Sequence, residues 1–285
     1  MASRPQSPCR HCATESLKET NMALDMVQYA LGAGSGGVVG FTLGLVGGGG
    51  SILAVPLMVY LVGVPNAHIA IGTSALAVAA NALTGLANHA RAQTVKWRCG
   101  GLYAAAGIAG AFAGSSIGKA VDGQKLLFLF ALLMFVIAFI MIKKRHHTGE
   151  EGAQCNRENA PKVLGFGLGT GIFSGFFGIG GGFLIVPGLM ASTRMPMLNA
   201  VGTSLVAVAA FGLTTALNYA FSGMVDWMLA MIFILGGVVG GVVGAAAARR
   251  LAAERGMLTT VFAGLIFVVA AYMLWRSSGA VLHAV

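Results

Sequence analysis

The sequence predicts an all-α polytopic membrane protein with two homologous halves of about four apolar segments each and Gly-broken helices. Three observations predict this class: 56% of the 285 residues are hydrophobic and only 9% are charged, the apolar stretches have membrane-spanning lengths, and the second half repeats the first. Soluble domains carry roughly 25% charged residues. Soluble enzymes and nucleic-acid-binding proteins are therefore excluded, and a multi-pass location in the cell membrane is expected.

The apolar segments follow one another at lengths that suit a bilayer, which needs roughly 20 helical residues per crossing. They cover 35–63, 67–90, 99–118 and 126–142, and then 163–191, 198–221, 228–248 and 257–275. The chain is accordingly divided into a polar N-terminal tail (1–30), a first membrane repeat (31–143), a hydrophilic linker (144–161), a second membrane repeat (162–276) and a C-terminal tail (277–285). No cleaved signal peptide is expected in the polar tail.

The charged and metal-ligating residues lie outside the apolar segments. The net charge of +9 comes from scattered Lys and Arg residues, which indicates loop charge that orients helices rather than a nucleic-acid partner. Cys9 and Cys12 with His11 supply fewer than the four ligands of a zinc site, so neither a metal nor a cofactor is expected. No disulfide is needed. With no carboxylate and no Lys or Arg at membrane depth, the chain lacks a fixed charge for coupling or for clamping an anion.

The two halves match when one is slid along the other at a nearly constant offset. The stretch from Val46 to Pro56 lies over that from Phe177 to Pro187, and Gly72-Thr73-Ser74 lies over Gly202-Thr203-Ser204. Asn88 pairs with Asn218, and Trp97 pairs with Trp227. Chance similarity between apolar helices would not align a Trp, an Asn and a Gly-Thr-Ser. An internal duplication of this kind is typical of transporters, whose substrate site lies at the repeat interface.

These residues resemble the sulfite exporter TauE/SafE family, also called the toluene sulfonate uptake permeases, over about residues 35–275. The resemblance rests on the Gly-rich break followed by Pro in each half, on the Gly-Thr-Ser after each break, and on the Val-Asp-Trp that ends at Trp227. The first half departs from it with Val95-Lys96-Trp97. The resemblance implies transport of sulfite, sulfonates or related sulfur-containing anions across the cytoplasmic membrane. Members differ in substrate, so the identity of the anion does not carry over.

The Gly-rich breaks are the first candidate site. Four consecutive glycines cannot sustain a strong helix, and non-helical backbone at membrane depth is tolerated only beside protein or a watered cavity. Helices that restart after each break would aim free N–H groups at an anion. The candidate residues are Gly47, Gly48, Gly49, Gly50, Ser51 and Pro56 in the first half, and Gly178, Gly180, Gly181, Gly182 and Pro187 in the second. The glycines could instead serve close helix packing, as Gly107, Gly110, Gly114, Gly236, Gly240 and Gly244 are expected to do.

Polar residues in the apolar segments complete the candidate site. Thr73, Ser74, Thr203 and Ser204 lie near helix starts, where they could bind substrate or only cap backbone donors. Asn88 and Asn218 are paired by the repeat, whereas Asn81 faces Phe211 in the alignment. His68 and His89 fall at segment edges, where a solvated imidazole is the commoner role.

The sequence therefore favours a transporter of a small anion, with the lipid bilayer and the solute as partners, and it is compatible with a homo-oligomer. The alternatives are a non-transporting assembly or scaffold protein, or a carrier of another small solute. An intramembrane enzyme is not expected, because no nucleophile or metal-ligand cluster lies in the apolar segments. Two topologies remain open, since the count of Lys and Arg inside is the same whether each Gly-rich unit crosses once or forms a re-entrant hairpin with inverted repeats.

Overall fold

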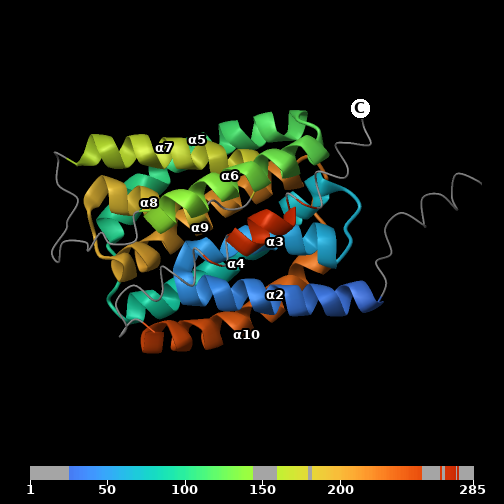
Figure 1. Ribbon diagram of the computed structural model, residues 1–285, viewed down its shortest axis with the longest axis horizontal. Coiled ribbons are helices and arrows are strands. Elements are labelled where there is room, and N and C mark those ends of the chain that lie inside the picture. The colour runs from blue at the N-terminus through green and yellow to red at the C-terminus, as the bar shows by residue number, and fades with distance from the viewer. Residues whose placement is uncertain are drawn as a thin grey trace, which may run out of the picture.

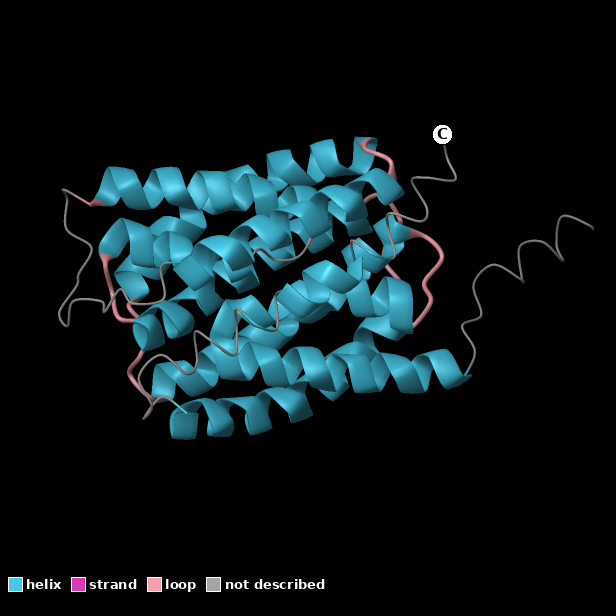
Figure 2. Cartoon of the chain, in the orientation of Figure 1, coloured by secondary structure: helices cyan, strands magenta, loops and turns pink. Residues whose placement is uncertain are grey.

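The structure is a computed structural model, and it describes residues 26–143, 159–178, 182–251, 264, 267–273 and 275. The helices run side by side along the longest axis of the molecule (Figure 1). Every regular element in this part of the chain is a helix (Figure 2). The predicted all-α class is confirmed.

The helices of the first half follow the predicted segments closely. They are α2 (Met26–Val46), the 3-10 helix η1 (Gly47–Leu53), the short α3 (Ala54–Pro56), the π-helical η2 (Leu57–Leu61), α4 (Ala67–Arg91), α5 (Trp97–Ala120) and α6 (Gly123–Lys143). The predicted segment 35–63 is thus divided where its glycines begin, because glycine has a low helix propensity and no side chain to hold an α-helical turn.

The second half contains α7 (Ala160–Phe177), α8 (Gly182–Thr193), α9 (Met197–Ala220) and α10 (Trp227–Leu251). The predicted segment 163–191 is divided between α7 and α8, again at its glycines. The last predicted segment, 257–275, lies largely outside the described residues.

Short polar side chains fix where several helices begin. Asn66 Oδ1 accepts a hydrogen bond from the N–H of His68 at the start of α4, over 2.9 Å. Asp122 and Asp226 do the same at the starts of α6 and α10, where their Oδ1 atoms accept from backbone N–H groups. A side-chain acceptor at this position satisfies one of the four free N–H groups of a helix start.

Several features of the surface indicate a lipid environment. Three helices are long and apolar enough to cross a membrane: α4, α9 and residues Trp227–Ala247 of α10. Large apolar side chains such as Phe112 and Val239 face outward. Trp97 and Trp227, which are 57% and 63% exposed, stand at the starts of α5 and α10. Tryptophan is enriched at both interfaces of membrane proteins, so exposed tryptophans at helix starts fit this environment.

Glycine allows two pairs of helices to pack at backbone distance. A Cβ on Gly40 of α2 would collide with the backbone of Gly237 in α10. In the same way, a Cβ on Gly171 of α7 would collide with the backbone of Gly107 in α5. Gly110, Gly114, Gly236, Gly240 and Gly244 are equally close to their partner helix, so their predicted packing role is confirmed.

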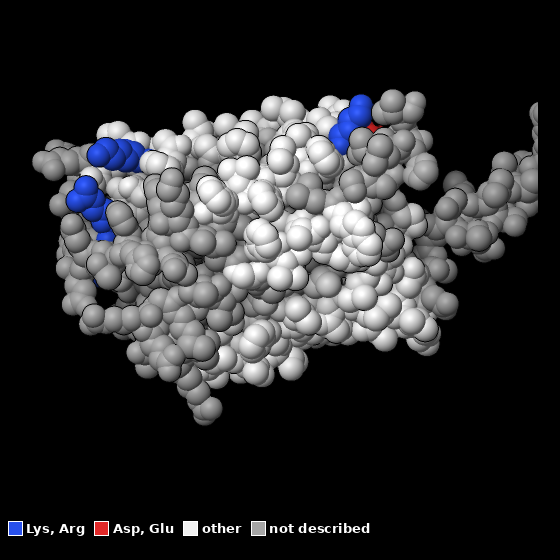
Figure 3. Space-filling view, viewed as in Figure 1, with Lys and Arg blue, Asp and Glu red and all other residues white. Residues whose placement is uncertain are grey.

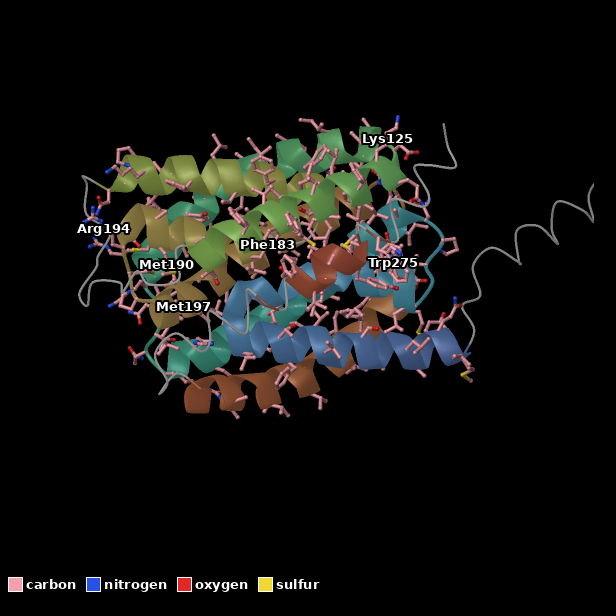
Figure 4. All side chains as sticks on the ribbon, in the orientation of Figure 1. Lys125, Phe183, Met190, Arg194, Met197 and Trp275 are labelled. Carbon is pink, nitrogen blue, oxygen red and sulfur yellow. The ribbon has the colours of Figure 1, made fainter. Side chains whose placement is uncertain are left out.

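Each Gly-rich break returns the chain to the end from which it came. Helix α2 begins at the right of Figure 1, and the loop 62–66 that follows η2 lies at the right again. Helix α7 begins at the left, and α8 leads from Phe183 in the centre back to Arg194 at the left (Figure 4). The chain therefore doubles back at each break, from opposite ends of the molecule, as re-entrant hairpins would and single crossings would not.

The basic residues are divided unequally between the two ends. Arg194 lies at the left end of Figure 4, the end at which α7 begins with Lys162 in its first turn. Lys96 belongs to the same end, since its N–H donates to Thr203 near the start of α9. Lys125 lies at the right end, and Lys119 precedes it in the last turn of α5. In Figure 3 the described side chains on the flank between the ends show no charge. Cys99, at the start of α5, is disulfide-bonded, and its partner lies outside the described residues.

Candidate functional site

The first break is a buried 3-10 helix. Gly47 opens it with φ +70°, a left-handed conformation that glycine adopts without strain. All residues from Gly47 to Leu53 are buried, Gly49 among them. Ser51 donates its hydroxyl to the carbonyl oxygen of Gly48 over 2.9 Å, and Gly50 packs against the backbone of α2. Pro56, also buried, ends α3 before the π-helical turn.

The second break begins at Gly178, which caps α7 with φ +68°. Its N–H donates to the carbonyl oxygen of Gly175 over 3.2 Å. The candidate residues Gly180 and Gly181 lie outside the described part of the chain. Helix α8 begins at the buried Gly182 and contains Pro187 within its first two turns.

The two breaks meet in the interior of the protein. A Cβ built on Gly48 would stand 2.7 Å from the Cα of Gly182 and 2.6 Å from Val208 Cγ2, and a Cβ on Gly182 would collide with the carbonyl oxygen of Gly48. The N–H of Gly48 donates to Ser204 Oγ over 3.3 Å. Gly48 and Gly182, one from each half of the chain, are thus brought together with a candidate serine of a third element, α9.

Each break also packs against the first turns of a helix from the other half. Gly47 lies against Val201 of α9, and Gly178 lies against Ile71 of α4, where an added Cβ would collide with either side chain. Ser204 and Ser74 follow these two residues and donate their hydroxyls to the carbonyl oxygens of Val201 and Ile71, over 2.7 and 3.0 Å. The serines are thus held next to the breaks.

The two candidate threonines accept backbone hydrogen bonds from loops that lie far away in the sequence. Thr73 Oγ1 accepts from the N–H of Asp226, and Thr203 Oγ1 accepts from the N–H of Lys96, both over 2.9 Å. Both threonines are fully buried. Their hydroxyls therefore hold the starts of α10 and α5 in place, and neither threonine caps the helix to which it belongs.

Asn88 and Asn218, paired in the sequence, have different surroundings. Asn218 donates from Nδ2 to Ser115 Oγ over 2.6 Å and to Ser116 Oγ, and its Oδ1 accepts from Lys119 Nζ over 2.8 Å. Asn88 is half-buried in the last turns of α4. No described contact connects either asparagine with the meeting point of the breaks.

Lys119 is the residue that sequence reasoning missed. It is half-buried and donates to Asn218 O, Asn218 Oδ1 and Ser222 Oγ over 2.8–3.1 Å, while its ammonium lies 5.9 Å from the ring centroid of Tyr219. Its position just beyond the predicted segment 99–118 made it look like an ordinary loop lysine. The sequence does hold one indication of its role. Lys119 falls at the end of a predicted helix, where a cation stabilises free carbonyl groups.

The meeting point of the breaks has polar groups but no fixed charge. Among the described residues, no Asp, Glu, Lys or Arg is buried, and no group of three or more His, Cys, Asp or Glu could hold a metal ion. The polar atoms near Gly48 are backbone amides and the hydroxyls of Ser51 and Ser204. These donors are engaged within the protein, since the Gly48 N–H donates to Ser204 and the two hydroxyls donate to the carbonyl oxygens of Gly48 and Val201. An anion would bind here by replacing these internal partners, and the set has no acid or base for proton transfer chemistry.

Comparison with known proteins gives consistent relatives. The family model described as "Sulfite exporter TauE/SafE" matches residues 32–273. A "Probable membrane transporter protein" of Xylella fastidiosa (strain 9a5c) is 53% identical over 251 residues, which is 86% of this chain and 94% of that protein. The "Probable membrane transporter protein YdhB" of Bacillus subtilis (strain 168) is 28% identical over 211 residues, 73% of this chain and 85% of that protein. No solved structure matches the chain.

Proposed function

Because the chain belongs to the sulfite exporter TauE/SafE family, we propose that it carries a small oxyanion across the cell membrane: sulfite, a sulfonate or a related sulfur-containing or organic anion. At the coarser level it is a multi-pass membrane transporter and not an enzyme. What we propose is the class of solute, a small oxyanion, and its passage across the cell membrane in particular.

The observation that carries the proposal is the contact between Gly48 and Gly182 in the buried centre. Two interruptions of the α-helical pattern meet there, the 3-10 helix η1 and the start of α8. Backbone at membrane depth that leaves the α-helical pattern is tolerated where it lines a pathway. Discontinuous helices that meet near the midplane are also how secondary transporters present amide groups to a substrate. An anion would be bound there by N–H and O–H donors that exchange their internal partners for it, since the described residues bury no fixed positive charge.

Of the candidate residues, we assign solute contact to the two breaks and their neighbouring hydroxyls. These are Gly47, Gly48, Gly49, Gly50, Ser51, Gly178, Gly180, Gly181, Gly182 and Ser204. The proposed role of the remaining candidates is support, because Thr73 and Thr203 accept from distant loops and Asn218 bonds to Lys119. Ser74, Asn88, Pro56 and Pro187 belong to this supporting group.

We also propose that the two halves are inverted repeats. The hydrogen bond between Asp226 and Thr73 has its counterpart in the one between Lys96 and Thr203, because the sequence repeat aligns Thr73 with Thr203 and Lys96 with Asp226. The hairpins that enter from opposite ends support the same proposal (Figure 1). Inverted repeats allow one half to rock against the other around a fixed site, which gives alternating access.

The test is flux in proteoliposomes that contain the purified full-length protein. Radiolabelled sulfite, sulfate and methanesulfonate are presented separately, and we expect saturable uptake or efflux of at least one of them above protein-free liposomes. A labelled cation of similar size is the matched control and should not be transported. Absence of flux for all three anions, with the protein folded and inserted, would contradict the proposal and favour an assembly role. Flux of the cation instead would favour a different solute class.

A further inference from the structure

Asn81 is a buried amide that has no hydrogen-bond partner. Neither Nδ2 nor Oδ1 is bonded to any atom in the part of the chain that the structure describes, although the residue is only 2% exposed. It lies near the middle of α4, the helix Ala67–Arg91 that is long enough to cross the membrane. An amide in apolar surroundings is unfavourable unless its donors and acceptors are satisfied. A bound molecule, such as a solute or a water, is therefore the partner to expect.

The amide lies where three helices meet. A Cβ on Gly237 of α10 would collide with the side-chain amide of Asn81, and a Cβ on Gly40 of α2 would collide with the backbone of the same Gly237. The absent side chain of Gly237 thus gives the amide its space. Ser35 of α2 has a buried Oγ that also lacks a partner. This three-helix group thus holds two polar side chains that no described residue satisfies.

The related position in the second half shows that packing does not require the amide. The sequence repeat that aligns Gly72 with Gly202 also aligns Asn81 with Phe211 and Gly107 with Gly237. The ring of Phe211 covers Gly107 of α5, just as the amide of Asn81 covers Gly237 of α10. One helix crossing is therefore filled by an aromatic ring, and the other keeps an amide in a space of the same kind.

We propose that Asn81 contacts the transported solute, with its Nδ2–H₂ group donating to an oxygen of the anion as the anion passes the middle of the membrane. This inference deepens the proposed function and rests on it. An anion is the partner that fits best, because the amide nitrogen can donate two hydrogen bonds. A cation fits less well, because it would need a carboxylate beside Oδ1, and the described residues bury none. The site would extend the pathway from the two breaks toward α10.

The experiment compares three variants in the flux assay and in thermal unfolding of the purified full-length protein. Asn81→Leu removes the amide at similar size, and Asn81→Asp keeps the shape while adding a negative charge. Thr84→Val is the matched control, because its hydroxyl lies one turn further along α4 and already donates to the carbonyl oxygen of Asn81 over 2.7 Å. We expect Asn81→Leu to raise the half-saturating anion concentration by roughly 10- to 100-fold, the size of one lost hydrogen bond to a charged group, without lowering the unfolding temperature.

The outcomes separate the possible roles. Asn81→Asp should lose still more flux by repelling the anion, and Thr84→Val should transport like the wild type. Wild-type flux from Asn81→Leu would overturn the inference, as would full activity of Asn81→Asp, which would indicate a cation. A lower unfolding temperature for Asn81→Leu would likewise overturn it in favour of a structural amide. If the wild type itself transports none of the three anions, it is the proposed function that fails.

Discussion

Gly48 and Gly182 lie in direct backbone contact although they belong to opposite halves of the chain: a Cβ on Gly48 would stand 2.7 Å from the Cα of Gly182. The contact joins the tip of one re-entrant hairpin to the first residue of the returning helix of the other. Close-packed interiors adjust poorly to an added methyl group when the neighbour is backbone. The first prediction follows from this contact.

We expect Gly48→Ala and Gly182→Ala each to lower the free energy of unfolding by about 1–3 kcal/mol, the usual range for overpacking. Thermal unfolding in detergent measures the change. Gly101→Ala and Gly169→Ala are the controls, because a Cβ at these helical positions meets no atom within 4 Å. They should be neutral or more stable, since alanine favours a helix by about 0.5–1 kcal/mol over glycine. Equal stability of both pairs of variants would show that the breaks are loosely packed.

The second prediction concerns Thr73 and Thr203, which accept the N–H groups of Asp226 and Lys96. Replacement by Val keeps the shape and leaves a backbone donor without its partner, so each variant should lose about 1–3 kcal/mol of stability. Thr→Ser variants, which retain the acceptor, should lose less. Because the two bonds have the same length, the two losses should be similar. A Val variant as stable as the wild type would mean that water replaces the threonine.

The third prediction tests the coupling between Lys119 and Asn218. Lys119 Nζ lies 2.8 Å from Asn218 Oδ1 and 3.1 Å from the Asn218 carbonyl oxygen. Lys119→Met, Asn218→Leu and the double variant form a double-mutant cycle measured by unfolding in detergent. We expect a coupling energy of about 0.5–3 kcal/mol, as for residues of one hydrogen-bond network. Strictly additive losses would show that the lysine is held by Ser222 alone.

The fourth prediction concerns orientation. The end that carries Arg91, Lys96, Arg98, Lys162 and Arg194 should face the cytoplasm, because basic loops are retained there. In a cysteine-free background, Gln124→Cys should react with a membrane-impermeant thiol reagent added to intact cells, and Ala92→Cys should react only after permeabilisation. Both positions are exposed at opposite ends.

Labelling of Ala92→Cys in intact cells would reverse the proposed orientation. It would leave the two opposed hairpins unaffected.

Much of the fold was determined by the sequence alone. Apolar length and glycine content are local properties, and they predicted α4, α5, α9 and α10 within a few residues and the interruption after Val46. The small-residue stripes of α5 and α10 were equally predictable, since a glycine every third or fourth residue marks a face for close packing. These features need no knowledge of any distant partner.

Only the tertiary structure decided the direction of the hairpins and the partners of the candidate residues. The positive-inside count was the same for both topologies, so charge could not choose between a single crossing and a return. That Thr203 accepts from Lys96, and that Asn218 belongs with Lys119, depends on how α9 packs against α5. Hydrophobic periodicity shows which face of a helix is buried. It does not show which helix covers that face, because many apolar surfaces are chemically equivalent and only their packed shapes distinguish them.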